Sequence, residues 1–92
     1  MDGVGIRTFP IGTPAGDYLL VSPVVSALVW HTDKWVCTDN KANEYGLGDT
    51  QEEATADLLS SLSDLRHWLE KHEATLPEKH REELAYLQEV MA

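Results

Sequence analysis

The second half of the chain carries hydrophobic residues at the spacing of an α-helix. Polar side chains occupy the other faces of this stretch, and Thr50–Glu53 just before it fits a capping box. In that motif the threonine hydroxyl accepts a bond from the third helical amide, and a glutamate there bonds back. The hydrophobic residues recur at intervals of three or four: Ala54, Leu58, Leu62, Leu65 and Leu69. This spacing predicts one long amphipathic helix over residues 51–71.

A second hydrophobic stripe follows near the end of the chain. It consists of Leu84, Leu87 and Val90, and Tyr86 lies off it. The segment 75–78 fits another capping box, with proline in the first turn, where its missing amide costs nothing. We predict a second helix here, with Glu82–Glu83 on its solvated face.

The first helix, about 30 Å long, is longer than a strand of about 17 Å. It therefore extends beyond any sheet that it covers. Leu65, Trp68 and Leu69 near its end need another cover. The second helix and a second subunit are the two candidates.

The first half of the chain has the features of β-structure. Apolar β-formers fill 24–30 and 35–38, and the polar break 31–34 between them favours an antiparallel hairpin. After an asparagine-containing turn at 39–43, residues 44–47 form a short third strand with Tyr45 and Leu47 on one face. Residues 1–22 read as a loose hairpin in which 4–8 and 18–21 flank a Gly- and Pro-rich turn.

These elements predict one α+β domain over residues 1–92. Its β-rich half is 1–48 and its two-helix half is 49–92. The expected architecture is a small antiparallel sheet of three to five strands, packed by one long helix, with a second C-terminal helix.

The composition is that of a cytoplasmic globular protein. Hydrophobic residues make up 42% of the chain and charged residues 25%, as in ordinary folded domains. No apolar run approaches the roughly 20 residues of a membrane span, and no basic-then-apolar leader opens the sequence. The single cysteine, Cys37, leaves no internal disulfide.

The net charge changes which partners are favourable. With 16 acidic and 7 basic residues, the chain carries −9. This sign disfavours direct contact with nucleic-acid phosphates and favours a basic protein, whose approach it would steer. The alternative is that the acidic surface serves only solubility.

Residues typical of catalysis are present but not at useful spacings. His67 and His72 are five apart, about 140° around a helix axis, and neither His-x3-His nor Cys-x2-Cys occurs. Cys37 lies in a strand and reads as a structural thiol. Gly46-x-Gly48 lacks the remainder of a phosphate loop and is followed by acids. We predict no catalytic residue, no metal site and no cofactor.

Tryptophans are frequent for so short a chain. Trp30 and Trp35 flank the hairpin turn, and Trp68 lies on the long helix. They either fill a thin core or act as anchors in an interface. With the acids of the long helix and the hairpin residues 31–35, they form the candidate partner-binding surface. The candidate residues are Glu52, Glu53, Asp57, Asp64, Trp30, Trp35 and Trp68.

The order of strands and helix resembles the HicB-like antitoxin family. Residues 45–54, Tyr-Gly-Leu-Gly-Asp-Thr-Gln-Glu-Glu-Ala, look like the family's core signature, in which a strand leads through Gly-Asp-Thr into a helix. Leu28–Trp30 and Trp35–Thr38 are similar to its first two strands. The resemblance covers roughly 24–69. The chain departs from the family at 39–43, where a proline-rich turn is usual, and in its final helix, where members often carry a DNA-binding module. The first 22 residues have no counterpart.

The resemblance implies an often dimeric α/β sandwich that sequesters a small, basic, RNA-cleaving toxin. Our first hypothesis is therefore a non-enzymatic, antitoxin-like inhibitor, possible as a homodimer, that binds neither nucleic acid nor membrane. A second is an acidic, phage-encoded anti-defence inhibitor whose carboxylates imitate phosphates and block a nucleic-acid-binding complex. A small enzyme or metal protein is the third, and it requires a bound metal or a deep polar pocket.

Overall fold

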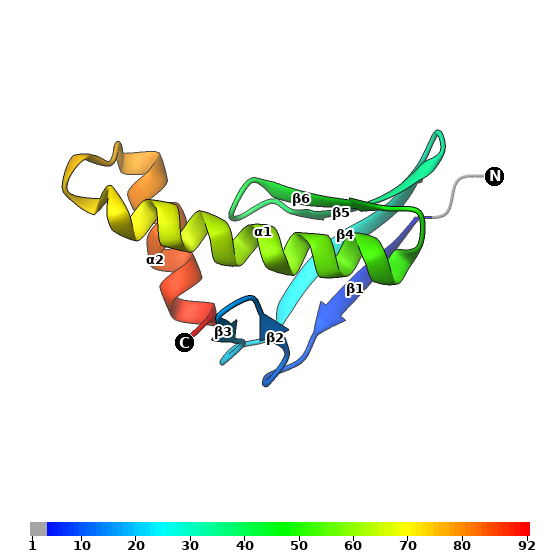
Figure 1. The fold of residues 1–92 in the computed structure, drawn as a ribbon, viewed down its shortest axis with the longest axis horizontal. Helices are drawn as coiled ribbons and strands as arrows, with labels where there is room; N and C mark the ends of the chain where they lie inside the picture. Colours follow the sequence, from blue (N-terminus) through cyan, green and yellow to red (C-terminus); the bar gives the residue numbers. More distant parts are fainter. Residues whose placement is uncertain (1–3) are drawn as a thin grey trace.

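The computed structural model describes residues 4–92 and has an α+β fold (Figure 1). A four-stranded antiparallel sheet has the order β1-β4-β5-β6. Its strands are β1 (Val4–Phe9), β4 (Val24–His31), β5 (Lys34–Asp39) and β6 (Glu44–Gly48). Helix α1 (Gln51–Lys71) runs along one face, and α2 (Glu78–Val90) follows a short 3₁₀ turn, η1 (Glu73–Thr75). A small hairpin pairs β2 (Pro14–Ala15) with β3 (Tyr18–Leu19). The predicted fold class is confirmed.

The three predicted strands of the central sheet are confirmed with small changes in their ends. Trp30 pairs with Trp35 across the β4–β5 hairpin, and Thr32 in its turn has a φ of 61°. In the β5–β6 turn, Asn43 has a φ of 55°. Asparagine tolerates this left-handed backbone, as the turn prediction requires.

The predicted hairpin over residues 1–22 is wrong. Strand β1 pairs with β4, with Ile6 opposite Ala27 and Phe9 opposite Val24. Strand β4 has eight residues, so after pairing with β5 it offers β1 a second long edge. The 18–21 segment bonds elsewhere: the Leu20 amide donates to Thr13 O, and the Leu19 amide donates to Ala92 O, both at 2.9 Å.

Two glycines let α1 lie directly on β6. A Cβ atom placed on Gly46 would lie 2.2 Å from Leu58 N and 2.4 Å from Ala54 O. One on Gly48 would lie 2.5 Å from Ala54 N. Since these neighbours are mostly helix backbone, they cannot rotate away as a side-chain end would. The core forms where this helix face meets the sheet, and Leu58, Leu62 and Cys37 are fully buried there.

Helix α2 supplies the cover that the end of α1 needs. Leu69 is fully buried in the same core cluster as Leu84 and Leu87, whereas Trp68 keeps 51% of its surface exposed. Tyr86 of α2 donates its hydroxyl to Asp39 Oδ2 at 2.7 Å, which joins the helix to the end of β5. The second helix therefore covers Leu69, whereas Leu65 is half-buried and Trp68 stays exposed.

The two predicted capping boxes have different outcomes. At α1, Thr50 Oγ1 accepts the Glu53 amide at 3.1 Å, as expected. At α2 the prediction is wrong, because Thr75 lies in η1 and donates its hydroxyl to His72 O at 3.2 Å. Pro77 is the N-cap of α2 and has no side-chain bond to offer.

Glu83 is not on a solvated face, contrary to the prediction. Its side chain is buried, and its two oxygens lie 2.8 Å from Asn43 Nδ2 and 2.8 Å from His80 Nδ1. Burial raises the pKa of Glu83, but the bonds from Asn43 and His80 outweigh it and hold the pKa below its ordinary value. The carboxylate thus fastens the β5–β6 turn to α2.

We expect Gly46→Ala to destabilise the fold by about 3 kcal/mol or more, because the new methyl group would displace the α1 backbone. Gly5→Ala is the matched control, since a Cβ there meets nothing within 4 Å. Urea unfolding measures both variants. Equal stability of the two would contradict the close approach of helix and strand.

We expect Glu83→Gln to lower the free energy of unfolding at pH 7 by about 1–2 kcal/mol, through loss of bonds to a charged group. A depressed folded-state pKa gives stability that is present above the unfolded value of about 4.3 and lost as pH falls through the folded value. The gap between wild type and variant should therefore shrink below about pH 4.

Glu82→Gln, on the exposed side of the same helix, serves as the control for that experiment. It should leave stability unchanged within about 0.5 kcal/mol. A pH-independent gap for Glu83→Gln would rule out the proposed ionised anchor.

Candidate functional site

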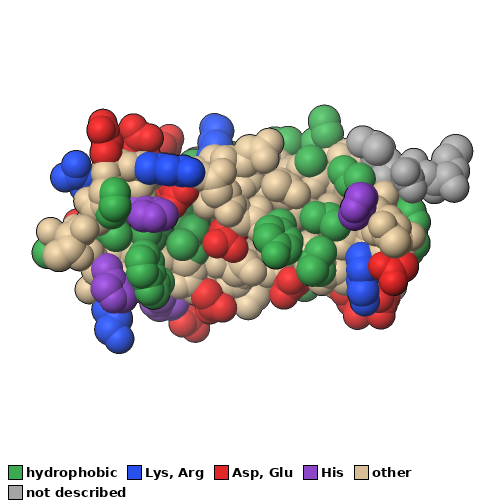
Figure 2. Space-filling model, turned by 90° about the horizontal axis from the view of Figure 1, so that it is seen from above, with side chains coloured by type: hydrophobic (Ala, Val, Ile, Leu, Met, Phe, Trp, Pro, Cys, Tyr) green, Lys and Arg blue, Asp and Glu red, His purple; other side chains and the backbone are tan. Residues whose placement is uncertain are grey.

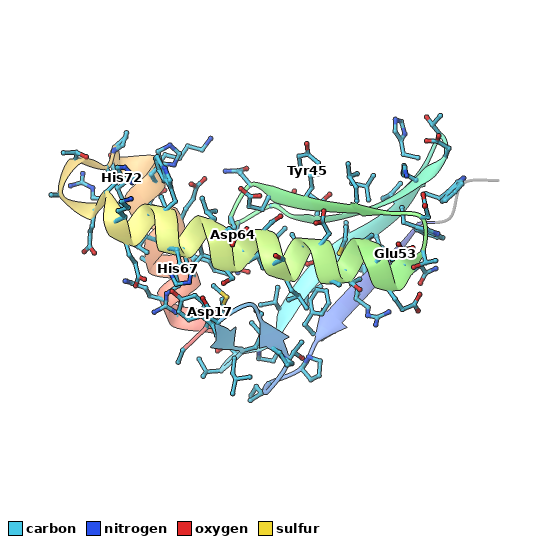
Figure 3. The ribbon with its side chains drawn as sticks, viewed as in Figure 1. Asp17, Tyr45, Glu53, Asp64, His67 and His72 are labelled. Carbon is cyan, nitrogen blue, oxygen red and sulfur yellow. The ribbon has the colours of Figure 1, made fainter. Side chains whose placement is uncertain are left out.

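Three of the predicted acids and one predicted tryptophan share a single side of α1. Glu53, Asp57, Asp64 and Trp68 fall within about 60° of one another at 100° per residue, and all four are exposed. We call these four residues the acidic stripe. Figure 3 shows Glu53 and Asp64 at separate points along α1. The stripe spans about 22 Å of helix axis.

The stripe runs beside β6, which is an edge strand of the sheet. The Leu47 amide, which has no strand to bond on that side, donates to Asp57 Oδ2 at 2.9 Å. A polar group that occupies an edge amide blocks pairing with a foreign strand. Asp57 therefore has a structural role in addition to its charge.

The stripe carboxylates have no cationic partner within residues 4–92. Ion pairs there involve other acids, such as Asp49, which Lys34 contacts at 2.6 Å, and Glu70, which Arg66 contacts at 3.4 Å. Glu52, the fourth predicted acid, is exposed but lies about 100° around the helix from Glu53. It is the one predicted acid that the structure places outside the stripe.

Carboxylates crowd where the stripe passes the start of β6. The pKa of Glu44 is raised by burial and by the nearby charges of Glu83 and Asp64. A positive group placed here would relieve this repulsion. Sequence reasoning missed both Glu44 and Glu83. The two-residue alternation of a strand could have indicated that Glu44 is partly buried, because it places Glu44 on the opposite face of β6 from the exposed Tyr45.

The three predicted tryptophans do not form a single cluster. Trp30 and Trp35 contact each other edge to face, with ring centroids 5.5 Å apart, and both are half-buried. Since Trp35 pairs with Gly48, they lie at the Glu53 end of α1. Trp68 lies at the other end. Trp35 packs against the core, as the structural interpretation expects, whereas Trp68 is available to a partner.

Two histidines frame Trp68. The His72 ring lies 4.5 Å from the Trp68 ring between centroids, and the His80 ring lies 6.3 Å away at 75°. His72 is also held at the end of α1, where its Nδ1 lies 2.8 Å from Trp68 O. The exposed indole is thus supported on two sides, so ordering it on binding would cost little side-chain entropy.

A polar network with a structural role joins α1 to the β2–β3 hairpin. His67 Nε2 lies 2.9 Å from Asp17 Oδ2, and His67 Nδ1 lies 3.2 Å from the Tyr18 hydroxyl. Arg66 stacks over the Tyr18 ring at 4.2 Å. An acid–histidine pair suggests catalysis, but a triad needs a nucleophile bonded to the histidine base. The hydroxyl at His67 is that of Tyr18, which donates to Glu70 Oε1 at 3.3 Å, and the Ser63 hydroxyl accepts the Asp17 amide at 3.4 Å.

The remaining candidates for chemistry have a structural explanation. Cys37 is fully buried, and burial raises the pKa of its thiol, which disfavours the reactive thiolate. In the part of the chain that the structure describes, no three His, Cys, Asp or Glu side chains gather as a metal site requires. The arrangement is suited to binding through charge and an aromatic anchor.

The fold and this surface define a small α+β protein with an exposed acidic helix. No helix among the described residues has the length and hydrophobicity needed to cross a bilayer. Comparison with protein-family models, curated proteins and solved structures found no match. The resemblance to HicB-like antitoxins therefore rests on the motif residues alone.

We expect Glu44→Gln to raise the free energy of unfolding at pH 7 by roughly 0.5 kcal/mol, the usual size of a like-charge repulsion. A raised folded-state pKa means that the ionised carboxylate destabilises the fold above that pKa. The gain should therefore vanish as pH falls through this value. Chemical unfolding at pH 7 and pH 3 provides the measurement. A variant less stable than wild type at pH 7 would contradict the repulsion, because it would mean that the ionised Glu44 stabilises the fold.

Proposed function

We propose that this protein is a non-enzymatic inhibitor that neutralises a basic macromolecular partner, in the manner of an antitoxin acting on a small RNA-cleaving toxin. The observation that carries the proposal is the acidic stripe, whose carboxylates have no cation within the described residues and whose far end is the exposed Trp68. The resemblance of residues 45–54 to the HicB-like signature supports the class of partner.

The charges and the tryptophan would have different tasks. A net charge of −9 accelerates encounter with a cationic surface, and the row of carboxylates selects its orientation. Most affinity in such interfaces comes from a few desolvated anchors, among which tryptophan is enriched. Trp68, held between two histidine rings, fits that role. Covering the basic surface of a nuclease removes the groups that bind the RNA phosphates.

A second candidate uses the same carboxylates against a different target. Glu53, Asp57 and Asp64 form a row of negative charge along α1, which could occupy a basic channel built for nucleic acid. An anti-defence inhibitor of this kind would bind a nucleic-acid-binding complex rather than a free toxin. The identity of the captured partner separates the two functions.

We expect Glu53→Lys/Asp64→Lys to weaken partner binding by roughly ten- to a hundredfold, because both charges meet the partner and neither carboxylate supports the fold. The partner is first recovered by crosslinking and co-purification from the native cells, and its RNA cleavage is then titrated with this protein. Wild type should block cleavage at a 1:1 ratio, and salt should weaken the block.

Glu78→Lys/Glu82→Lys, on exposed positions of α2, is the matched control with the same change in net charge. It should retain inhibition within about threefold. Equal loss in both variants would mean that net charge, and not the stripe, determines binding. A partner without nuclease activity would contradict the antitoxin-like function while leaving the binding surface in place.

A further inference from the structure

Strand β1 has one edge that no other strand occupies within residues 4–92. It ends the order of the sheet on its side and lies at the border of the ribbon, with β4 along its inner edge (Figure 1). The β4–β5 hairpin determines where the main-chain groups point. Its two-residue turn makes His31 and Lys34 a hydrogen-bonded pair. Because the direction of bonding alternates along a strand, Ser26 and Leu28 bond toward β1.

The main-chain groups of Ile6 and Thr8 face the open edge of β1. Arg7 stands opposite Ser26 and bonds to β4, so the residues on either side of it point the other way. Among the described residues, no turn or loop bond takes the Ile6 or Thr8 amide. The edge therefore offers a run of unpaired N–H and C=O groups, which is a template for another strand.

We propose that the β1 edge receives an extended segment of a partner protein, which adds a fifth antiparallel strand to the sheet and places a carboxylate against Arg7. The other edge is blocked, because the outward-pointing Leu47 amide of β6 is bonded to Asp57. The groups at β1 repeat every two residues, about 6.8 Å along the strand. An extended polypeptide has donors and acceptors at the same repeat, so strand addition is the mode of binding that this edge suits.

Arg7 selects the chemistry of the added segment. Its side chain is half-buried on the α1 side of the sheet, and no acid of the described range lies within ion-pair distance of it. A charge at such a place on an edge strand discourages most pairing, because a strand without an acid would cover the guanidinium and leave it unpaired. A carboxylate directly opposite Arg7 accepts its hydrogen bonds, so Arg7 discriminates in favour of an acidic segment.

The next two positions of the segment meet apolar or open surroundings. Ile6 lies on the face of the sheet opposite α1, which we call the outer face, and its exposed apolar side chains are Ile6, Val25, Tyr45 and Leu47. Figure 2 shows hydrophobic side chains exposed over the sheet half of the molecule. A β-branched residue opposite Ile6 would extend this surface. A Cβ placed on Gly5 meets nothing within 4 Å, so an aromatic side chain opposite Gly5 can lie over it.

A second copy of β1 does not meet the requirement at Arg7. The strand contains no acid, so pairing two copies would leave both arginines without a carboxylate. The acidic stripe does not repel the incoming acid, because it lies beside β6. Three strand spacings of about 4.8 Å separate β6 from β1, which is more than the Debye length of about 8 Å at physiological salt. Since the two surfaces are separate, the inference does not depend on the proposed function.

Fluorescence anisotropy of the labelled, end-capped peptide Ser-Thr-Glu-Val-Phe-Thr tests the edge against the full chain at up to about 1 mM. Its glutamate, valine and phenylalanine are placed to stand opposite Arg7, Ile6 and Gly5. We expect a dissociation constant of about 100 μM, because so short a strand makes few contacts. Methylation of the valine nitrogen, which donates to the Ile6 carbonyl, should weaken binding more than about tenfold. Methylation of the phenylalanine nitrogen, which points away from β1, is the matched control and should change binding by less than about threefold.

Charge selection is tested with Arg7→Gln, which should weaken binding of this peptide about two- to fivefold. It should leave unchanged the weaker binding of a peptide with glutamine in place of glutamate. Lys41→Gln, which removes an exposed cation from the β5–β6 turn, is the matched control and should bind like wild type. Circular dichroism should show both variants folded.

Amide NMR spectra of wild type should change at Ile6 and Thr8 when the peptide binds, and not at Leu47. The proposal is overturned by an absence of binding at about 1 mM, by equal binding of the peptide methylated at valine, or by changes at the β6 edge. Equal effects of Arg7→Gln on both peptides overturn the selection of an acid. Loss of peptide binding to a dimer seen in sedimentation velocity would assign the edge to a second copy and overturn the proposal.

Discussion

The direct contact between α1 and the edge strand β6 determines most of what this molecule presents to its surroundings. Gly46 and Gly48 have no side chains, so the helix backbone approaches the strand to a distance that a Cβ atom would forbid. The buried face of α1 is then fixed, with Leu58 and Leu62 against the sheet. Because a helix buried on one side must expose the other, the same contact determines where Glu53, Asp57 and Asp64 lie.

The positions of the two helices explain why one face of the sheet is uncovered within residues 4–92. One helix can shield only one side of a sheet, and α2 does not add a third layer. Its Tyr86 and Glu83 are bonded to Asp39 and Asn43 at the end of the sheet, so it closes the core beyond the strands. The apolar outer face is thus a consequence of where the second helix is fastened, and two buried polar anchors hold it there.

Sequence reasoning predicted the elements whose signal is local. Helix α1, its Thr50 cap and the hairpin of β4 and β5 follow from periodicity, capping chemistry and turn residues within a few positions. The pairing of β1 with β4 depends on residues about 20 positions apart, and no local pattern specifies it. The Thr75 cap failed because residues 73–75 form η1 and α2 begins only after Pro77. Glu83 was misplaced because a buried carboxylate is recognised only by its partners, Asn43 and His80.

The candidate site shows the same division between local and distant information. Glu53, Asp57, Asp64 and Trp68 could be placed on one side of α1 from helix geometry alone, whereas the separation of Trp68 from Trp30 and Trp35 required the fold. In the folded protein, the acidic residues and the exposed apolar residues lie on different sides. Carboxylates line α1 beside β6, and apolar side chains fill the far side of the sheet. The charged surface and the apolar surface are therefore distinct, because the helix that carries the carboxylates covers the other face of the sheet.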